Sequence, residues 1–291
     1  MLHDVCDRRK TVFNVSSLDS RHKKYRKLLK TGLNARVTQE YWPLLQSELK
    51  VLLDGFADNP KEFTKHIRRN AAAVIMKMAF GYTVTENDPF IKVTEDTSKI
   101  SGLAMAPGRW LVDYFPIMRY LPSFLPGTGW KLQGEIWRQQ LEGLSEVPHK
   151  WVKKQMETGD FIESFTSRYI RPNGIDMVDA EQEDIVKWCA GGLYAGASDT
   201  TLCALVSFIM LMALNPPIQS KAQAELDALA GKGHVLQPSD LSKLEYLPAV
   251  MKEVLRYAPV ANLALPHGVT QEDEYKGYRI PEGATVIANV W

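Results

Sequence analysis

An acid, two hydroxyl residues and three glycines lie together in the stretch AGGLYAGASDTT, residues 190–201. Asp199 stands beside Thr200, and a carboxylate next to a hydroxyl is the minimum needed to relay protons into a buried pocket. Three glycines inside a helix cost it roughly 2–3 kcal/mol relative to alanine, which a groove for a flat, rigid body would explain. The alternative is that the small residues only permit close helix packing and that the acid and hydroxyls form a solvated kink. The glycines are Gly191, Gly192 and Gly196.

A second cluster is the pair Glu253 and Arg256, whose i, i+3 spacing on a helix suits a bidentate ion pair. The pattern alone is weak, because Glu135 and Arg138 match it too, and most such pairs are exposed and contribute little. The Glu253–Arg256 match is more specific than the other one, because it follows the Asp-Thr-Thr group and precedes the segment GYRIPEGATVIANVW.

Helical periodicity dominates the elements that must position these residues. One long helix is predicted from near Asp179, which has capping-box spacing to Gln182, to the stop at Asn215-Pro216-Pro217. Its length of roughly 50 Å would take it across the centre of the protein. Two or three helices are predicted within 35–80, with a break near Asn59-Pro60, and one helix over about 134–157. After the long helix come an amphipathic helix that follows Pro217 and a helix from Pro248 to just before Pro259. Two strands are predicted in 275–291, around a type I turn at Pro281-Glu282-Gly283.

Residues 104–130 differ from the rest, because prolines alternate there with aromatic residues and prevent long helices. Short turns pinned by aromatic packing are predicted for this segment. Its prolines are Pro107, Pro116, Pro122 and Pro126.

The composition is that of a soluble globular protein, with 45% hydrophobic and 24% charged residues and a net charge of +1. Three scattered cysteines are too few for a disulfide framework or a zinc site and favour a reducing compartment. The longest apolar run, Leu202 to Leu214, is too short to span a bilayer. A basic nucleic-acid-binding helix would rest on residues 21–30 alone, and the net charge argues against it.

The ordered set of motifs resembles the cytochrome P-450 family of haem-thiolate monooxygenases, and it is most similar to fungal members that oxidise hydrophobic secondary metabolites. FIMLMALNPPIQSKAQAELDAL looks like the end of the family's oxygen-activating helix and the helix after it, and YLPAVMKEVLRYAPV looks like its Glu-x-x-Arg helix. The resemblance covers nearly the whole chain. It implies a fold that is mainly α with a minor β portion, with a long central helix and a C-terminal β-hairpin, as a single incomplete domain over residues 1–291.

The resemblance also assigns roles along the long helix. Gly196 and Ala197 would line the groove for haem and oxygen, although the family usually has glycine where Ala197 stands. Thr200 would hydrogen-bond bound oxygen and Asp199 would help deliver protons. The pair of Glu253 and Arg256 would be structural.

Further matches concern the haem propionates and the electron donor. Residues 20–27 resemble the helix that carries Trp-x-x-x-Arg, where Arg26 keeps its place and His22 replaces the tryptophan. His267 matches another propionate contact, although a lone histidine is more often a surface or core residue. A flavoprotein reductase that passes electrons from NADPH would dock on the basic face of this helix, whose alternative is a plain solvated face. Its lysines are Lys23, Lys24, Lys27 and Lys30.

The departures from the family pattern concern the iron ligand and the membrane anchor. The family holds its iron through a cysteine thiolate beyond the Glu-x-x-Arg helix, and none of Cys6, Cys189 and Cys203 has that context. The arginine that completes the Glu253–Arg256 cluster, the N-terminal anchor and the substrate loop before Arg21 are also not found. The sequence therefore reads as a partial gene product or a faulty gene model, with no metal ligand of its own.

The function implied by the resemblance is insertion of one atom of O2 into a hydrophobic small molecule, in secondary metabolism or on a xenobiotic. Family members work at the endoplasmic reticulum membrane on its cytosolic face, whereas this chain alone is expected to be cytosolic or unstable. The truncated chain is expected to be catalytically incompetent. The alternative is a non-catalytic helical fragment or relic that binds no haem.

Overall fold

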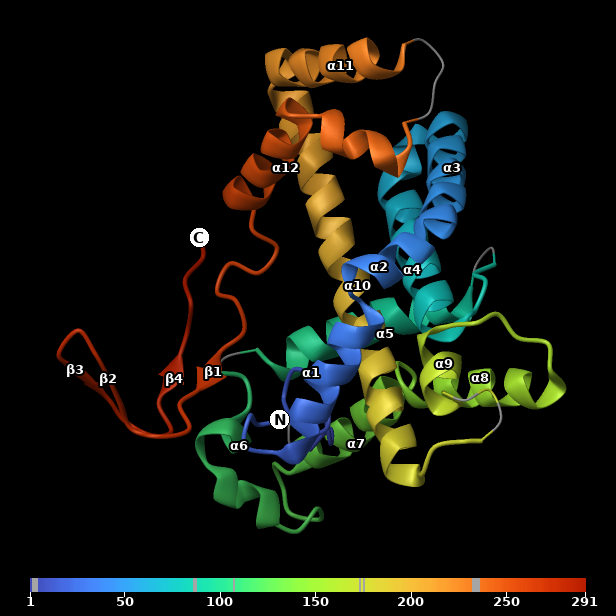
Figure 1. Cartoon of the computed structure of the whole chain (residues 1–291). Helices are drawn as coiled ribbons and strands as arrows, with labels where there is room; N and C mark the ends of the chain where they lie inside the picture. The colour runs from blue at the N-terminus through green and yellow to red at the C-terminus, as the bar shows by residue number, and fades with distance from the viewer. Residues whose placement is uncertain (2–4, 86–87, 107, 173, 175, 232–235) are drawn as a thin grey trace. The chain divides into compact units, whose positions relative to one another are not determined.

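The computed structural model describes residues 1, 5–85, 88–106, 108–172, 174, 176–231 and 236–291. The chain divides into two compact units, residues 1–199 and 200–291. The boundary falls inside the longest helix, α10 (Ala180–Leu214), drawn in yellow to gold in Figure 1. That the whole chain is one incomplete domain stays a prediction.

The first unit is built from helices joined by short connections (Figure 1). In chain order they are α1 (Ser20–Gly32), α2 (Ala35–Glu40), α3 (Trp42–Asp58), the 3-10 turn η1 (Pro60–Glu62), α4 (Phe63–Phe80), α5 (Pro89–Ala104), α6 (Leu111–Tyr114), the 3-10 turn η2 (Pro116–Tyr120), α7 (Gly129–Glu142), α8 (Glu146–Thr158), α9 (Phe165–Ile170) and the first part of α10. The predicted break near Asn59-Pro60 is confirmed, because Asn59 ends α3 and Pro60 opens η1.

The main core of the first unit surrounds the start of α10. Tyr194, Ile185 and Val186 of this helix are fully buried together with Tyr25 of α1 and Phe80 of α4. The helix begins where sequence predicted, because Asp179 Oδ1 accepts a hydrogen bond of 2.8 Å from the backbone N–H of Gln182. Two glutamates in its first turn add a favourable interaction with the helix dipole.

Two predictions in the first unit need correction. The helix expected over 134–157 is two helices, because α7 ends before Gly143 and α8 starts only after Ser145. A Cβ at Gly143 would meet a methyl group of Val93 at 3.0 Å, so this break lets the chain pass close to α5.

The segment over 104–130 forms short elements as predicted, but aromatic packing does not pin most of it. Trp110 does pack edge-on against Trp137, with ring centroids 5.5 Å apart. Tyr114 is 62% exposed and Phe124 is 83% exposed, so an apolar surface faces outward here. Pro107 lies outside the described residues.

The second unit contains the end of α10, then α11 (Pro216–Ala230), the 3-10 turn η3 (Pro238–Lys243), α12 (Tyr246–Tyr257) and four short strands. The Glu225 side chain of α11 accepts hydrogen bonds of 2.7–2.8 Å from three backbone N–H groups at the start of α12. These bonds satisfy donors that a helix start leaves open and fix α12 on α11. Met212, Val250 and Val254 form the small core of this unit.

The strands pair differently from the prediction. β2 (Asp273–Tyr275) and β3 (Tyr278–Ile280) form an antiparallel hairpin that turns at Lys276-Gly277, where both residues have positive φ. β4 (Thr285–Val286) pairs instead with β1 (His267–Gly268). Residues 281–283 therefore link two sheets, and Gly283 at φ +79° with an Ala284 N–H to Pro281 O bond of 3.1 Å makes a type II turn, not type I.

α10 is also the helix of the described residues that is long and apolar enough to cross a membrane by length and composition alone. The core helix of a soluble protein passes the same test. Sequence inspection missed this property because it considered only the apolar run from Leu202 to Leu214, which is interrupted by Ser207 alone, and not the whole helix.

Candidate active site along the long helix

The three glycines of α10 lie in two different environments, which give different reasons for the missing side chain. A Cβ at Gly191 would lie 2.7 Å from Ser145 Cβ and 3.3 Å from the Leu144 carbonyl oxygen, and a Cβ at Gly192 would lie 2.9 Å from a methyl of Val12. At these two positions the packing alternative is confirmed, because neighbouring segments touch the helix backbone. At Gly196 the nearest atom is Phe13 Cζ at 3.4 Å, an ordinary contact, so packing alone does not demand a glycine there.

Asp199 is held by a neighbouring helix. Its Oδ2 accepts a hydrogen bond from the Ser98 hydroxyl of α5, and both side chains are half-buried. Thr200, the next residue, has an exposed side chain and is the first residue of the second unit. The acid and the hydroxyl are therefore consecutive residues of α10, and the acid contacts α5.

The two candidate propionate contacts on α1 share one small hollow. His22 and Arg26 line a cavity of about 300 Å³ together with Tyr25, Leu29 and Val12. Arg26 is exposed and makes no ion pair within the described residues. A guanidinium in such a hollow suits a carboxylate ligand.

The basic face of α1 is less uniform than the sequence indicates. Lys23, Lys27 and Lys30 are exposed. Lys24, in contrast, forms a close ion pair with Glu181 in the first turn of α10. It therefore connects two helices of the first unit and is not a free surface charge.

In the second unit, Glu253 and Arg256 form the predicted bidentate pair. Arg256 Nε and Nη2 donate to the two carboxylate oxygens at 2.8 and 2.6 Å, which lowers the pKa of Glu253. The side chains are 61% and 68% exposed. The lookalike pair is looser, because Arg138 Nη1 lies 3.9 Å from Glu135 Oε2. His267 is exposed at the edge of β1.

The cysteines occupy three different environments. Cys6 and Cys189 are fully buried, and burial raises the pKa of both thiols, that of Cys189 to about 12. Such thiols stay protonated and do not suit a thiolate ligand. Cys203 is exposed in the part of α10 that belongs to the second unit.

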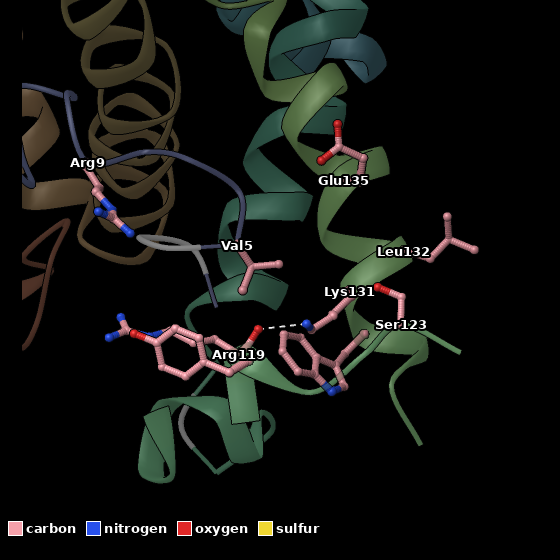
Figure 2. Close-up of a pocket in the computed structure, with 9 residues that line it drawn as sticks. Val5, Arg9, Arg119, Ser123, Lys131, Leu132 and Glu135 are labelled. Carbon is pink, nitrogen blue, oxygen red and sulfur yellow. Dashed lines mark hydrogen bonds between the residues drawn. The ribbon is translucent and has the colours of Figure 1, made fainter. Parts of the chain in front are cut away.

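A larger hollow lies where η2 meets the start of α7 (Figure 2). Its volume is about 770 Å³, and its lining combines Tyr120, Trp130 and Leu132 with charged side chains. Lys131 Nζ closes one side by donating to the Arg119 carbonyl oxygen at 2.7 Å, the dashed line in Figure 2. Residues 111–124, which expose several aromatic and apolar side chains, contribute Tyr120 and Ser123 to the lining of this hollow.

Sequence reasoning missed the residues of α5 that contact α10. Ser98 and Thr94 reach Asp199 and Tyr194 across about one hundred positions of sequence. The only available signal was a set of hydroxyl residues at helical spacing, Thr94, Thr97, Ser98 and Ser101, in a helix that otherwise mixes charged and apolar residues.

Comparison with known proteins identifies the family. Residues 2–291 match the sequence profile of cytochrome P450. The cytochrome P450 monooxygenase claR of Ampulloclitocybe clavipes is 36% identical over 95% of this chain and 51% of its own length. Cytochrome P450 monooxygenase 208 of Postia placenta is 37% identical over 85% of the chain, and the O-methylsterigmatocystin oxidoreductase of Aspergillus flavus is 32% identical over 88%. The chain spans about half the length of the curated relatives it matches. With a mainly helical fold built on a long α10, it belongs to the cytochrome P450 family.

Proposed function

We propose that residues 1–291 supply the oxygen-binding side of a haem-dependent monooxygenase that inserts one atom of O2 into a hydrophobic small molecule. Membership of the cytochrome P450 family supports the reaction class, and fungal relatives support secondary metabolism as its setting. The observation that carries the proposal is Gly196, a helix glycine that costs stability without a packing reason. A flat cofactor lying against that turn would supply the reason.

Residues of the first unit fit two parts of a haem, the flat ring and the propionate groups, as the family pattern assigns them. Gly196 and Ala197 present a helix surface with almost no side chain, which admits a planar ring. Arg26 and His22 line a hollow with a cationic wall, which suits carboxylate groups such as the propionates. His267 belongs to the second unit and is proposed as a further propionate contact from the family pattern alone.

The cysteines of the chain do not fit the thiolate ligand that the family uses, because Cys6 and Cys189 are buried and Cys203 lies on the long helix itself. The 291-residue chain alone is therefore proposed not to form a thiolate-ligated haem protein. Adding haem, dithionite and carbon monoxide to the purified chain tests this. The red-shifted Soret band of a thiolate complex would overturn this part of the proposal.

The proposed chemistry of the chain's own residues is proton delivery. Haem supplies oxygen activation when it is bound. Asp199, half-buried but in reach of solvent, would take up a proton at its carboxylate. The hydroxyl of Thr200 would pass the proton on its Oγ1 into the groove and would be reprotonated by the Asp199 carboxyl group. The groove itself would exclude bulk water and hold the apolar substrate near that hydroxyl.

The reaction is tested with a chimera in which residues 1–291 replace the matching half of the Ampulloclitocybe clavipes monooxygenase. We expect haem incorporation with the thiolate signature, and we expect Thr200→Ala to lower product formed per NADPH by roughly tenfold or more, within the range of one acid–base group. Thr201→Ala, a change at the neighbouring exposed threonine, is the matched control and should keep the ratio. A chimera that has native helical content but takes up no haem would contradict the proposal.

The proposed electron donor is a flavoprotein reductase at the endoplasmic reticulum membrane, docked on the exposed lysines of α1. Lys23, Lys27 and Lys30 are free of ion pairs within the described residues, whereas Lys24 is paired with Glu181. Lys27→Glu should therefore raise the KM for reductase in the chimera and weaken the salt dependence of reduction. An unchanged KM would remove this helix from the docking surface.

The hollow of Figure 2 is proposed to serve the hydrophobic substrate. Its walls of Tyr120, Trp130 and Leu132 adjoin an exposed apolar segment, and such surfaces mark ligand grooves or contact sites. Leu132→Arg should raise the substrate KM in the chimera while leaving the haem spectrum unchanged.

A further inference from the structure

Two hydroxyl groups on one face of α5 bind α10 on either side of its open glycine turn. Thr94 and Ser98 are four residues apart, so they lie one above the other on that face. Thr94 bonds Tyr194, and Ser98 bonds Asp199. Gly196 and Ala197 lie between those two positions of α10.

The first of these contacts is a buried anchor. Thr94 is 5% exposed and Tyr194 is fully buried. Tyr194 Oη donates to the Phe90 carbonyl oxygen of α5, while the Thr94 hydroxyl donates to Tyr194 Oη. Since each group has a partner, this pair fixes the register of α5 on α10.

The second contact has a different character, because its acceptor is an ionisable group. Ser98 Oγ donates to Asp199 Oδ2, and no lysine, arginine or histidine of the first unit's described residues forms an ion pair with that carboxylate. A neutral hydroxyl, not a cation, therefore orients the acid. Both side chains are half-buried, so this bond directs the carboxylate without pairing it to a fixed charge.

We propose that Ser98 is a positioning residue for Asp199: its hydroxyl holds the carboxylate toward α5, so that the seating of α5 on α10 sets the direction of the acid beside Thr200. This inference rests on the proposed function for the consequence, proton delivery, but not for the contact itself. Thr94 carries the same type of group on the same face of α5. Thr94→Val keeps the bond from Tyr194 Oη to the Phe90 carbonyl oxygen, and with it the register of the two helices, so it provides a matched control.

The test uses the full 291-residue chain with ¹³C-labelled aspartate carboxylates, in which Asp199→Asn assigns the Asp199 signal. Ser98→Ala should shift that signal, Ser98→Thr should restore it, and Thr94→Val should leave it nearly unchanged. An Asp199 signal that Ser98→Ala does not move, or that Thr94→Val moves equally, overturns the proposal. If Ser98→Ala does not fold, Ser98→Cys, which weakens the donor at nearly constant size, gives the same comparison.

A double-mutant cycle on the same chain measures the contact by urea unfolding. Ser98→Ala and Asp199→Ala should each raise the unfolding equilibrium constant by about tenfold, as expected for a hydrogen bond to a charged group that is partly solvated. The double variant should raise it no further than the larger single effect, and strict additivity would overturn the contact.

In the chimera, Ser98→Ala should lower product per NADPH and Thr94→Val should not. If Asp199→Asn also leaves this ratio unchanged, the proposed role of the acid fails while the contact measured above stands. If Asp199→Asn lowers the ratio and Ser98→Ala does not, the positioning inference alone fails.

Discussion

Replacing each glycine of α10 by alanine in turn separates the two structural reasons for these residues. Alanine in place of glycine stabilises a helix interior by about 0.8–1 kcal/mol when nothing obstructs the new methyl group. The three positions share one helix, so this gain is common to them. The differences between the variants therefore report only what the added Cβ meets.

At Gly191 the Cβ would lie 2.7 Å from Ser145 Cβ and 3.2 Å from Ser145 Cα, so backbone must move. Overpacking of this kind costs about 1–3 kcal/mol, which exceeds the helix gain, and Gly191→Ala should destabilise the chain by up to about 2 kcal/mol. At Gly196 the only near atom among the described residues is Phe13 Cζ at 3.4 Å, on a ring that is 54% exposed. Gly196→Ala should therefore stabilise the chain by about 0.5–1 kcal/mol.

Urea unfolding followed by circular dichroism measures both changes as shifts of the midpoint at constant slope. Gly192→Ala, against a single methyl of Val12 at 2.9 Å, should fall between the other two variants. In the chimera the same Gly196→Ala should weaken haem incorporation, a stabilising change that harms function. Equal stabilities of the Gly191 and Gly196 variants would refute the distinction between a packed and an open turn.

Three further predictions concern single groups. Burial lowers the pKa of His149, so the folded state disfavours its protonation, and the free energy of unfolding should fall as the pH drops below the ordinary histidine pKa of about 6.5. His149→Gln, which can still donate to Glu183, should weaken this dependence of stability on pH, as measured by unfolding from pH 7.5 to 5. A thiol reagent should modify Cys203 at once in the native chain and the two buried cysteines only after denaturation, and immediate reaction of all three would contradict their burial. Glu253→Ala and Glu135→Ala should both leave the soluble yield of the 291-residue chain unchanged, because both ion pairs are exposed. In the chimera only Glu253→Ala should abolish haem-loaded protein. If the chimera tolerates both substitutions equally, the Glu-x-x-Arg pair has no structural role.

Sequence reasoning succeeded where the cause is local. The start of α10 follows from one side-chain cap at Asp179, and its end follows from two consecutive prolines after Asn215. The Glu253–Arg256 pair follows from i, i+3 spacing on one helix. The cytochrome P450 family was likewise readable, because it depends on the order of such local motifs.

Tertiary structure decided everything that depends on distance across the chain. Three glycines within six residues look alike in sequence, yet only the approach of Ser145 and Val12 makes two of them packing residues and leaves Gly196 open. β4 pairs with β1, and not with the strand before the turn, because hydrogen bonds between strands depend on where the segments meet in space. For the same reason no pattern could show that Ser98 holds Asp199, since a hydrogen bond across 101 residues exists only once α5 lies on α10.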